Sequence, residues 1–240
     1  MRGVGVPIGG VVDRVLVPMT GSFTHAVQHT VTGVPVTPRG PDRLHSTLAI
    51  DLGDGFMLLP HGPRDALLPF TGVLSFVGVP PLTGPLSTNS YITSVEALTG
   101  GLGGIPQSAI LRFRSRISGT PTAIGPFVPL AKFTMPAIDK PWDGRTVKFD
   151  LPTATADLVI MNVSASDGST AWTIVTPGDT RQINLPDFSA KPELGVPVGN
   201  LVLGVVAAKL EGFSYDAVRY GQLGRSAWSA FSYETAFGYW

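Results

Sequence analysis

The sequence predicts an all-β protein built from antiparallel β-sandwich domains, with Greek-key-like connections and very little helix. Three observations support this prediction. Short runs of β-branched, aromatic and aliphatic residues recur along the chain, and turn residues separate them. Glycine and proline number 29 and 22 among 240 residues, so proline interrupts most windows that are long enough for a helix. Charged residues make up only 14%, against about 25% in ordinary globular domains, so the chain is too apolar to be disordered.

In the first half of the chain, apolar runs bounded by turn residues predict a series of strands. The expected strands lie at residues 22–36, 48–59, 72–79, 91–98, 110–117 and 127–135. The run at 48–59 contains Gly53-Asp54-Gly55, which predicts a hairpin because Asp-Gly readily adopts the positive φ of a tight turn. The run at 110–117 alternates strictly between basic and mainly apolar positions, which predicts a half-buried antiparallel strand.

The second half shows more regularly spaced strand signals, and a change in composition near residues 136–143 separates it from the first. The expected strands lie at residues 146–151, 157–164, 171–176, 181–185, 201–210 and 228–239. A short helix is expected around 215–223. We therefore expect two domains, an N-terminal β-rich domain at 1–136 and an antiparallel sandwich at 137–240.

Three features of the second half carry a resemblance to a known family. They are Trp172-x-Ile174 in the third strand, Leu185-Pro186-Asp187 after the fourth, and the long apolar run at 201–208. With these features, residues 137–240 resemble the fibronectin type III and immunoglobulin-like modules of bacterial secreted and envelope proteins. The resemblance implies a spacer or docking module located outside the cell or in the envelope. The unusually aromatic last strand departs from the family pattern.

Composition and motifs argue against several chemistries. The chain has no cysteine, which excludes disulfides and thiolate metal sites, and its 17 basic and 17 acidic residues do not form the basic surface of a nucleic-acid-binding protein. It contains neither Gly-x-Ser-x-Gly nor His-Glu-x-x-His. His25 and His29 are about 13 Å apart along a strand, too far to share one metal ion. We expect no cofactor, metal or catalytic residue, and a secreted hydrolase is the least favoured alternative.

Two stretches are candidate interaction surfaces. Arg112, Arg114 and Arg116 form a basic stripe on one strand, which is either a solvated face that guards a sheet edge or a contact for an acidic partner. Near the C-terminus, Phe231, Tyr233, Phe237 and Tyr239 share one strand face, and Trp240 is the last residue. The aromatic face is either a closing core strand or a strand offered to another subunit.

These observations favour a non-catalytic structural or interaction subunit of an extracellular or cell-envelope assembly that acts through apolar subunit interfaces. Its expected partners are other protein subunits, a second copy of the chain included, and no transmembrane segment is expected. The alternatives are a capsid or shell subunit with a jelly-roll fold and a carbohydrate-binding module. In the latter, Trp142, Trp172, Trp228 or Tyr91 would stack on sugar faces. Exposed aromatic residues in a row would favour glycan binding, and aromatic residues buried between chains would favour assembly.

Overall fold

The computed structural model describes residues 23–59, 62–137, 140, 142–152, 154–165, 171–187, 189–191 and 199–239. Over these residues the all-β prediction is confirmed, since the helical elements present there are short 3-10 turns. The strands are β1 (His25–Val31), β2 (Arg43–Asp51), β3 (Phe56–Leu58), β4 (Arg64–Leu67), β5 (Val73–Val79), β6 (Ser90–Leu98), β7 (Gln107–Ser115), β8 (Thr122–Ile124), β9 (Lys132–Met135), β10 (Thr146–Asp150), β11 (Leu158–Ala165), β12 (Ala171–Pro177), β13 (Gln182–Asn184), β14 (Asn200–Leu210) and β15 (Trp228–Tyr239). The 3-10 turns are η1 (Gly84–Leu86), η3 (Tyr215–Ala217), η4 (Tyr220–Leu223) and η5 (Arg225–Ala227).

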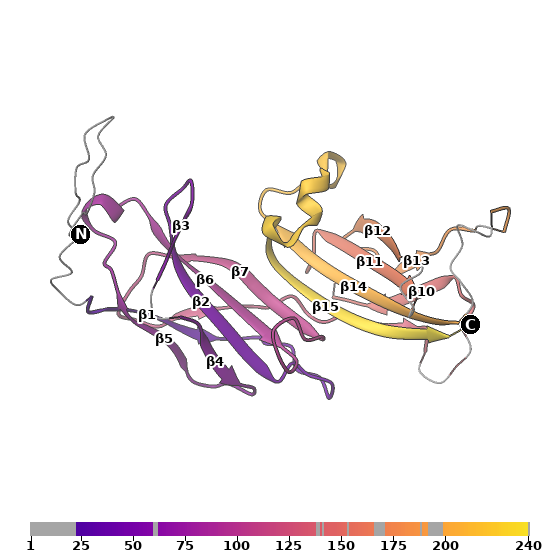
Figure 1. Ribbon diagram of the computed structural model, residues 1–240, viewed down its shortest axis with the longest axis horizontal. Helices are drawn as coiled ribbons and strands as arrows, with labels where there is room; N and C mark the ends of the chain where they lie inside the picture. The colour runs from indigo at the N-terminus through magenta and orange to yellow at the C-terminus, as the bar shows by residue number, and fades with distance from the viewer. Residues whose placement is uncertain are drawn as a thin grey trace, which may run out of the picture.

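One nine-stranded antiparallel sheet runs along the long axis of the molecule (Figure 1). Its order is β12-β11-β14-β15-β7-β6-β2-β3, and β4 also pairs with β2. Two three-stranded sheets, β5-β1-β8 and β13-β10-β9, pack against it. Among the described strands, every pair is antiparallel except β1 with β8, which is parallel.

Both small sheets cover the same face of the large sheet, which we call the inner face. In the N-terminal half, the buried side chains of β2 alternate with exposed ones and meet β1 and β5. In the C-terminal half, the odd-numbered residues of β11 and β14 form the core over β10. Ile110 of β7 packs against both cores, which places them on one side of the sheet.

The opposite face, which we call the outer face, is covered only in part. Residues 211–227, which include η3, η4 and η5 and which we call the outer segment, cross it near the junction of β7 and β15 (Figure 1). Phe213 and Leu223 of this segment pack over Trp228 and Phe231, which are 7% and 2% exposed. The predicted short helix at 215–223 is thus present as two 3-10 turns.

Strands from either side of the predicted domain boundary at residues 136–137 pair with one another. β7 pairs with β15 over the four residues 230–233, and β9 pairs with β10. Independent folding of the two predicted domains stays a prediction. None of the helices in the described ranges is long and apolar enough to cross a bilayer.

The strict alternation expected in β7 is wrong at one point. The register between β6 and β7 shifts between Thr93 and Val95, so an extra residue is inserted near Leu111. As a result Ile110 and Phe113 both reach the inner core, whereas Leu111 packs against the cluster on the outer face. The bulge therefore moves Ile110 away from the face that carries the arginines.

Candidate interaction surfaces

The aromatic residues of β15 share one face, as their spacing predicts, but they differ in exposure. Phe231 is buried under the outer segment, and Tyr233 is half-buried, which raises the pKa of its phenol by desolvation. Phe237 and Tyr239 are 73% and 70% exposed. Trp240 lies outside the described residues. The outer segment covers only the first half of β15. On this face, the first half of the strand is therefore buried, and the second half is exposed to solvent.

The exposed half of β15 belongs to a larger surface on the outer face. Phe237 is the cross-strand neighbour of Val202 on β14, which in turn is opposite Ser164 on β11. We call this surface the uncharged face. It consists of Thr235, Phe237 and Tyr239 on β15, Asn200 and Val202 on β14, Asn162 and Ser164 on β11, and Thr173 on β12.

A glycine of β14 allows an aromatic ring to lie across the sheet beside the uncharged face. A Cβ added to Gly204 of β14 would be 2.8 Å from Cε2 and 2.9 Å from the phenol oxygen of Tyr233. The ring of Tyr233 therefore lies over the backbone of β14. Beside it, the Thr173 hydroxyl donates to the side-chain oxygen of Asn162 over 3.1 Å. This hydrogen bond holds two of the polar side chains of the uncharged face in place.

The arginine stripe of β7 is engaged by other parts of the chain. Arg114 donates from Nη1 to both carboxylate oxygens of Glu211, at 2.9 and 3.0 Å, and from Nε to Asp51 over 3.3 Å. These two carboxylates raise the pKa of Arg114. The hydrogen bond from the Gly53 backbone N–H lowers the pKa of Asp51 most, and the hydrogen bond from Arg114 lowers it further. Arg114 therefore connects the β2–β3 hairpin to the outer segment.

The neighbouring arginines also hold main-chain carbonyls. Arg112 donates to the carbonyl of Ser226 in the outer segment, and Arg116 donates to the carbonyl of Ser87. Arg225 of the outer segment pairs with Glu96 of β6, and its guanidinium carbon lies 4.7 Å from the centre of the Phe231 ring. Arg112 and Arg114 thus fix the outer segment onto the sheet, and Arg116 holds the turn at Ser87. The arginines of the stripe are therefore hydrogen-bonded within the chain, and their contact with an acidic partner stays a prediction.

Sequence reasoning missed a second exposed apolar surface at the opposite end of the molecule. Phe56 and Leu58 of β3 and Leu67 of β4 are 57%, 82% and 72% exposed. They lie opposite Asp51, Ala49 and Arg43 of β2, which places all three on the outer face. We call these three residues the edge strip. The Phe56-x-Leu58 alternation was the available signal, but the sequence does not say which face of a short edge strand meets solvent.

Three of the four aromatic residues expected to stack on sugars in a carbohydrate-binding module are buried. Trp142, Trp228 and Tyr91 are 6%, 7% and 1% exposed. The polar atom of each ring donates to a backbone carbonyl, those of Thr146, Gln222 and Pro80 respectively. Trp172 is half-buried against the inner core. The sequence did not predict the burial of Trp142, Trp228 and Tyr91. Amphipathic rings like these pack into a core when their polar atoms find hydrogen-bond partners.

The histidines are dispersed. His29 is fully buried, and His45 pairs with Asp65 over 2.8 Å on the outer face. His61 is outside the described residues. Within the described ranges, no three His, Asp or Glu side chains gather in a way that could hold a metal ion. The Asp51–Gly55 segment forms the expected hairpin turn, with the Gly53 N–H donating to Asp51 and the Leu52 N–H to Gly55.

One open, shallow groove lies on the opposite side of the sheet from the outer segment. Its lining residues are Pro129, Leu130, Lys132, Asp150, Leu151, Pro152 and Arg181. The guanidinium of Arg181 donates to the backbone carbonyls of Leu151, Pro152, Gly178 and Thr180, so it acts as a structural brace. The groove does not bring together an acid, a base and a nucleophile.

Comparison with known proteins gives no family assignment. No family model matches the chain, and a search of curated proteins finds none with a similar sequence. The resemblance of residues 137–240 to fibronectin type III and immunoglobulin-like modules stays a prediction.

Proposed function

We propose that the protein is a non-catalytic structural or interaction subunit of an extracellular or cell-envelope assembly. The edge strip carries this proposal. Phe56 and Leu58 lie two residues apart on one face of β3, and Leu67 lies on β4 about 20 Å further along the same edge of β2, because their partners Ala49 and Arg43 are six residues apart. All three side chains expose most of their apolar surface to solvent. Large exposed apolar side chains along one sheet edge are typical of protein contacts, because solvent-exposed patches are otherwise kept small.

The energetics favour burial of this strip against another subunit. Transfer of one leucine or phenylalanine side chain out of water contributes about 1.5–3 kcal/mol. The three side chains belong to strands of three and four residues, which are too short for an extended strand addition. The contact is therefore expected to be made by side chains. The low content of charged residues, 14%, agrees with a surface that partners cover in part.

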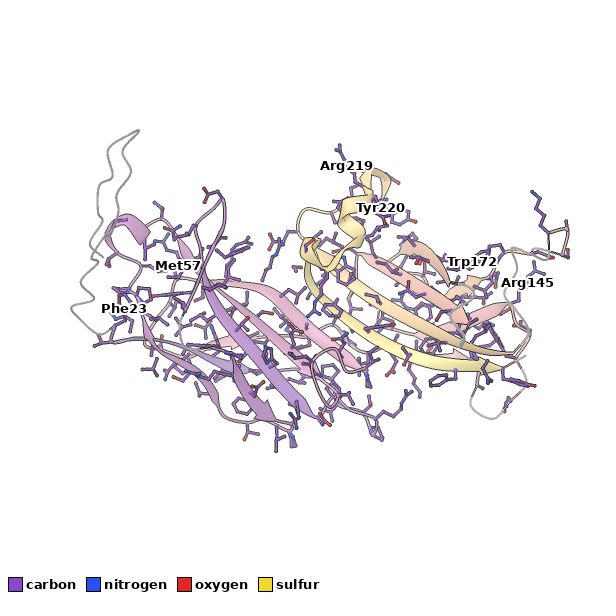
Figure 2. The ribbon with its side chains drawn as sticks, in the orientation of Figure 1. Phe23, Met57, Arg145, Trp172, Arg219 and Tyr220 are labelled. Carbon is purple, nitrogen blue, oxygen red and sulfur yellow. The ribbon has the colours of Figure 1, made fainter. Side chains whose placement is uncertain are left out.

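Native mass measured by light scattering over a wide range of protein concentration tests this proposal. We expect the mass to exceed the 25.2 kDa of one chain or to rise with concentration. Leu58→Asp and Leu67→Asp should each shift the protein towards the single-chain mass. Tyr220→Asp is the control, because Tyr220 is 90% exposed on the outer segment, away from β3 and β4 (Figure 2). A constant single-chain mass at every concentration would refute self-assembly through this strip.

A further inference from the structure

We propose that the uncharged face is a binding site for a neutral saccharide, with Phe237 and Tyr239 as its stacking residues. The two rings are two residues apart on one face of β15, about 7 Å along the strand. Both are exposed, at 73% and 70%. A pyranose ring has an apolar C–H face that packs on an aromatic ring, and two rings in a row can contact successive sugar units.

The polar side chains around the rings match the hydroxyl groups of a sugar. Asn162, Ser164, Thr173, Asn200 and Thr235 each offer a neutral donor, an acceptor or both. They lie on four neighbouring strands, with Asn162 beside Thr173 and Ser164 in the row of Phe237. Donors and acceptors are thus spread across the sheet beside the aromatic row, where equatorial hydroxyl groups of a stacked sugar would point.

The charge of the surface narrows the class of ligand. All eight residues of the uncharged face are uncharged. Arg39 beside it donates to the Thr235 carbonyl over 3.3 Å and lies 3.8 Å from the Glu234 carboxylate, and the arginines of β7 are bound to groups of the outer segment and nearby turns. An acidic polysaccharide would need free cations at this surface. A neutral sugar needs none. The site is therefore assigned to neutral saccharides.

The same surface fits a protein partner less well. The central part of a protein interface is enriched in aromatic residues, methionine and arginine and is poor in serine. The uncharged face contains two exposed aromatic residues among asparagine, serine and threonine and one valine, Val202. The edge strip, by contrast, is mainly aliphatic, and aliphatic side chains offer no planar surface for stacking. The two surfaces are therefore suited to different ligands.

The site has one closed end. The outer segment covers the part of the sheet beyond Tyr233, and the phenol of Tyr215 donates to the carbonyl of Val175, two residues from Thr173. A saccharide bound to Phe237 and Tyr239 would therefore extend from the uncovered end of the sheet towards the outer segment. Figure 2 shows Arg219 and Tyr220 at the apex of the outer segment, pointing away from the sheet. Tyr220 is 90% exposed and serves as a control for a non-specific aromatic effect.

Affinity electrophoresis through gels that contain a soluble neutral polysaccharide tests the site. The probes are hydroxyethyl cellulose, xylan, galactomannan, glycogen and glycol chitosan that has been fully N-acetylated. We expect at least one gel to retard the protein. Phe237→Ala and Tyr239→Ala should each weaken that binding about tenfold, since each removes one stacking contact. Tyr220→Ala should retain wild-type retardation.

Three results would overturn the proposal. These are the absence of retardation in every neutral gel, equal retardation of the Phe237→Ala/Tyr239→Ala double variant, and retardation only by an acidic polysaccharide such as alginate. Circular dichroism of the variants confirms that both remain folded. Loss of binding at Phe237 or Tyr239 without a change in native mass separates this site from the edge strip. A change in native mass on the same substitutions would instead indicate a protein partner on the uncharged face.

Discussion

Acidification is expected to destabilise the protein through one side chain, His29. This residue lies in β1 between the small N-terminal sheet and the large sheet, and it is fully buried. Its Nε2 lies 2.8 Å from the Thr93 hydroxyl, and its ring meets Phe113 edge-on at a centroid distance of 5.5 Å. Its Nδ1 has no hydrogen-bond partner of good geometry among the described residues. Burial lowers the pKa of His29 from 6.5 to about 4, although a backbone group of Thr122 partly opposes the shift.

The sign of the effect follows from the protons bound in each state. Between pH 6.5 and pH 4 the unfolded chain binds a proton at His29 that the folded chain does not. The free energy of unfolding therefore falls as the pH falls through this window, by about 2.5 kcal/mol between pH 7.5 and pH 4.5. Above pH 6.5 the contribution is constant. Glu234 has the opposite sign, because burial raises its pKa and its charged form is disfavoured in the folded state.

Urea unfolding of the wild type and of His29→Gln at pH 7.5 and pH 4.5 isolates this contribution. His29→Gln cannot be protonated, so its stability should fall less between the two pH values, by about 2.5 kcal/mol. The carboxylates are common to both proteins and cancel in the comparison. His25→Gln, at an exposed position of the same strand, should retain the wild-type pH dependence. An equal fall for His29→Gln and the wild type would refute the reasoning.

Three further predictions concern stability and are checked by urea unfolding at neutral pH. Phe149→Ala should cost about 3–5 kcal/mol, because Phe149 is 1% exposed at the centre of the C-terminal core; a loss below 1 kcal/mol would contradict the packing described. Gly204→Ala should cost about 1–3 kcal/mol, because its Cβ would meet the ring of Tyr233, and Tyr233→Ala in the same chain should relieve most of that strain. Arg114→Ala should cost less than about 1 kcal/mol, since the Arg114 side chain is 42% exposed and its ion pair with Glu211 is screened by salt. A loss of stability that does not change with salt would show that the contribution of Arg114 is not electrostatic.

The strands of the second half could be predicted closely because their limits depend on local chemistry. β15 begins and ends at the predicted residues, and β12 ends at a turn in which the Thr180 N–H donates to the Pro177 carbonyl. Turn residues and alternation act over a few positions, so a sequence window contains the information. The shared aromatic face of β15 was predictable for the same reason.

Strand order and exposure were not predictable, because they depend on distant parts of the chain. The strands β4 and β8, of four and three residues, were not predicted from the sequence. Each is short and pairs with a strand distant in the sequence, β4 with β2 and β8 with β1. The bulge in β7 was also not predicted. Phe231 and Phe237 have the same parity on one strand, yet only the first is buried, because the outer segment happens to cross it. Local pattern assigns the face, and tertiary packing decides whether that face meets water.

The continuity of the nine-stranded sheet has a geometric consequence for how the molecule would act in an array. A flexible linker lets two binding sites sample many relative orientations. In this protein, backbone pairing of β7 with β15 holds the N-terminal and C-terminal halves of the molecule in one relative orientation. The edge strip and the uncharged face lie towards opposite ends of the long axis, on the same side of the sheet (Figure 1). A subunit anchored at one end would therefore present the other at a set distance and angle. Repeated copies would display their sites in register, and weak individual contacts would then add up to high avidity.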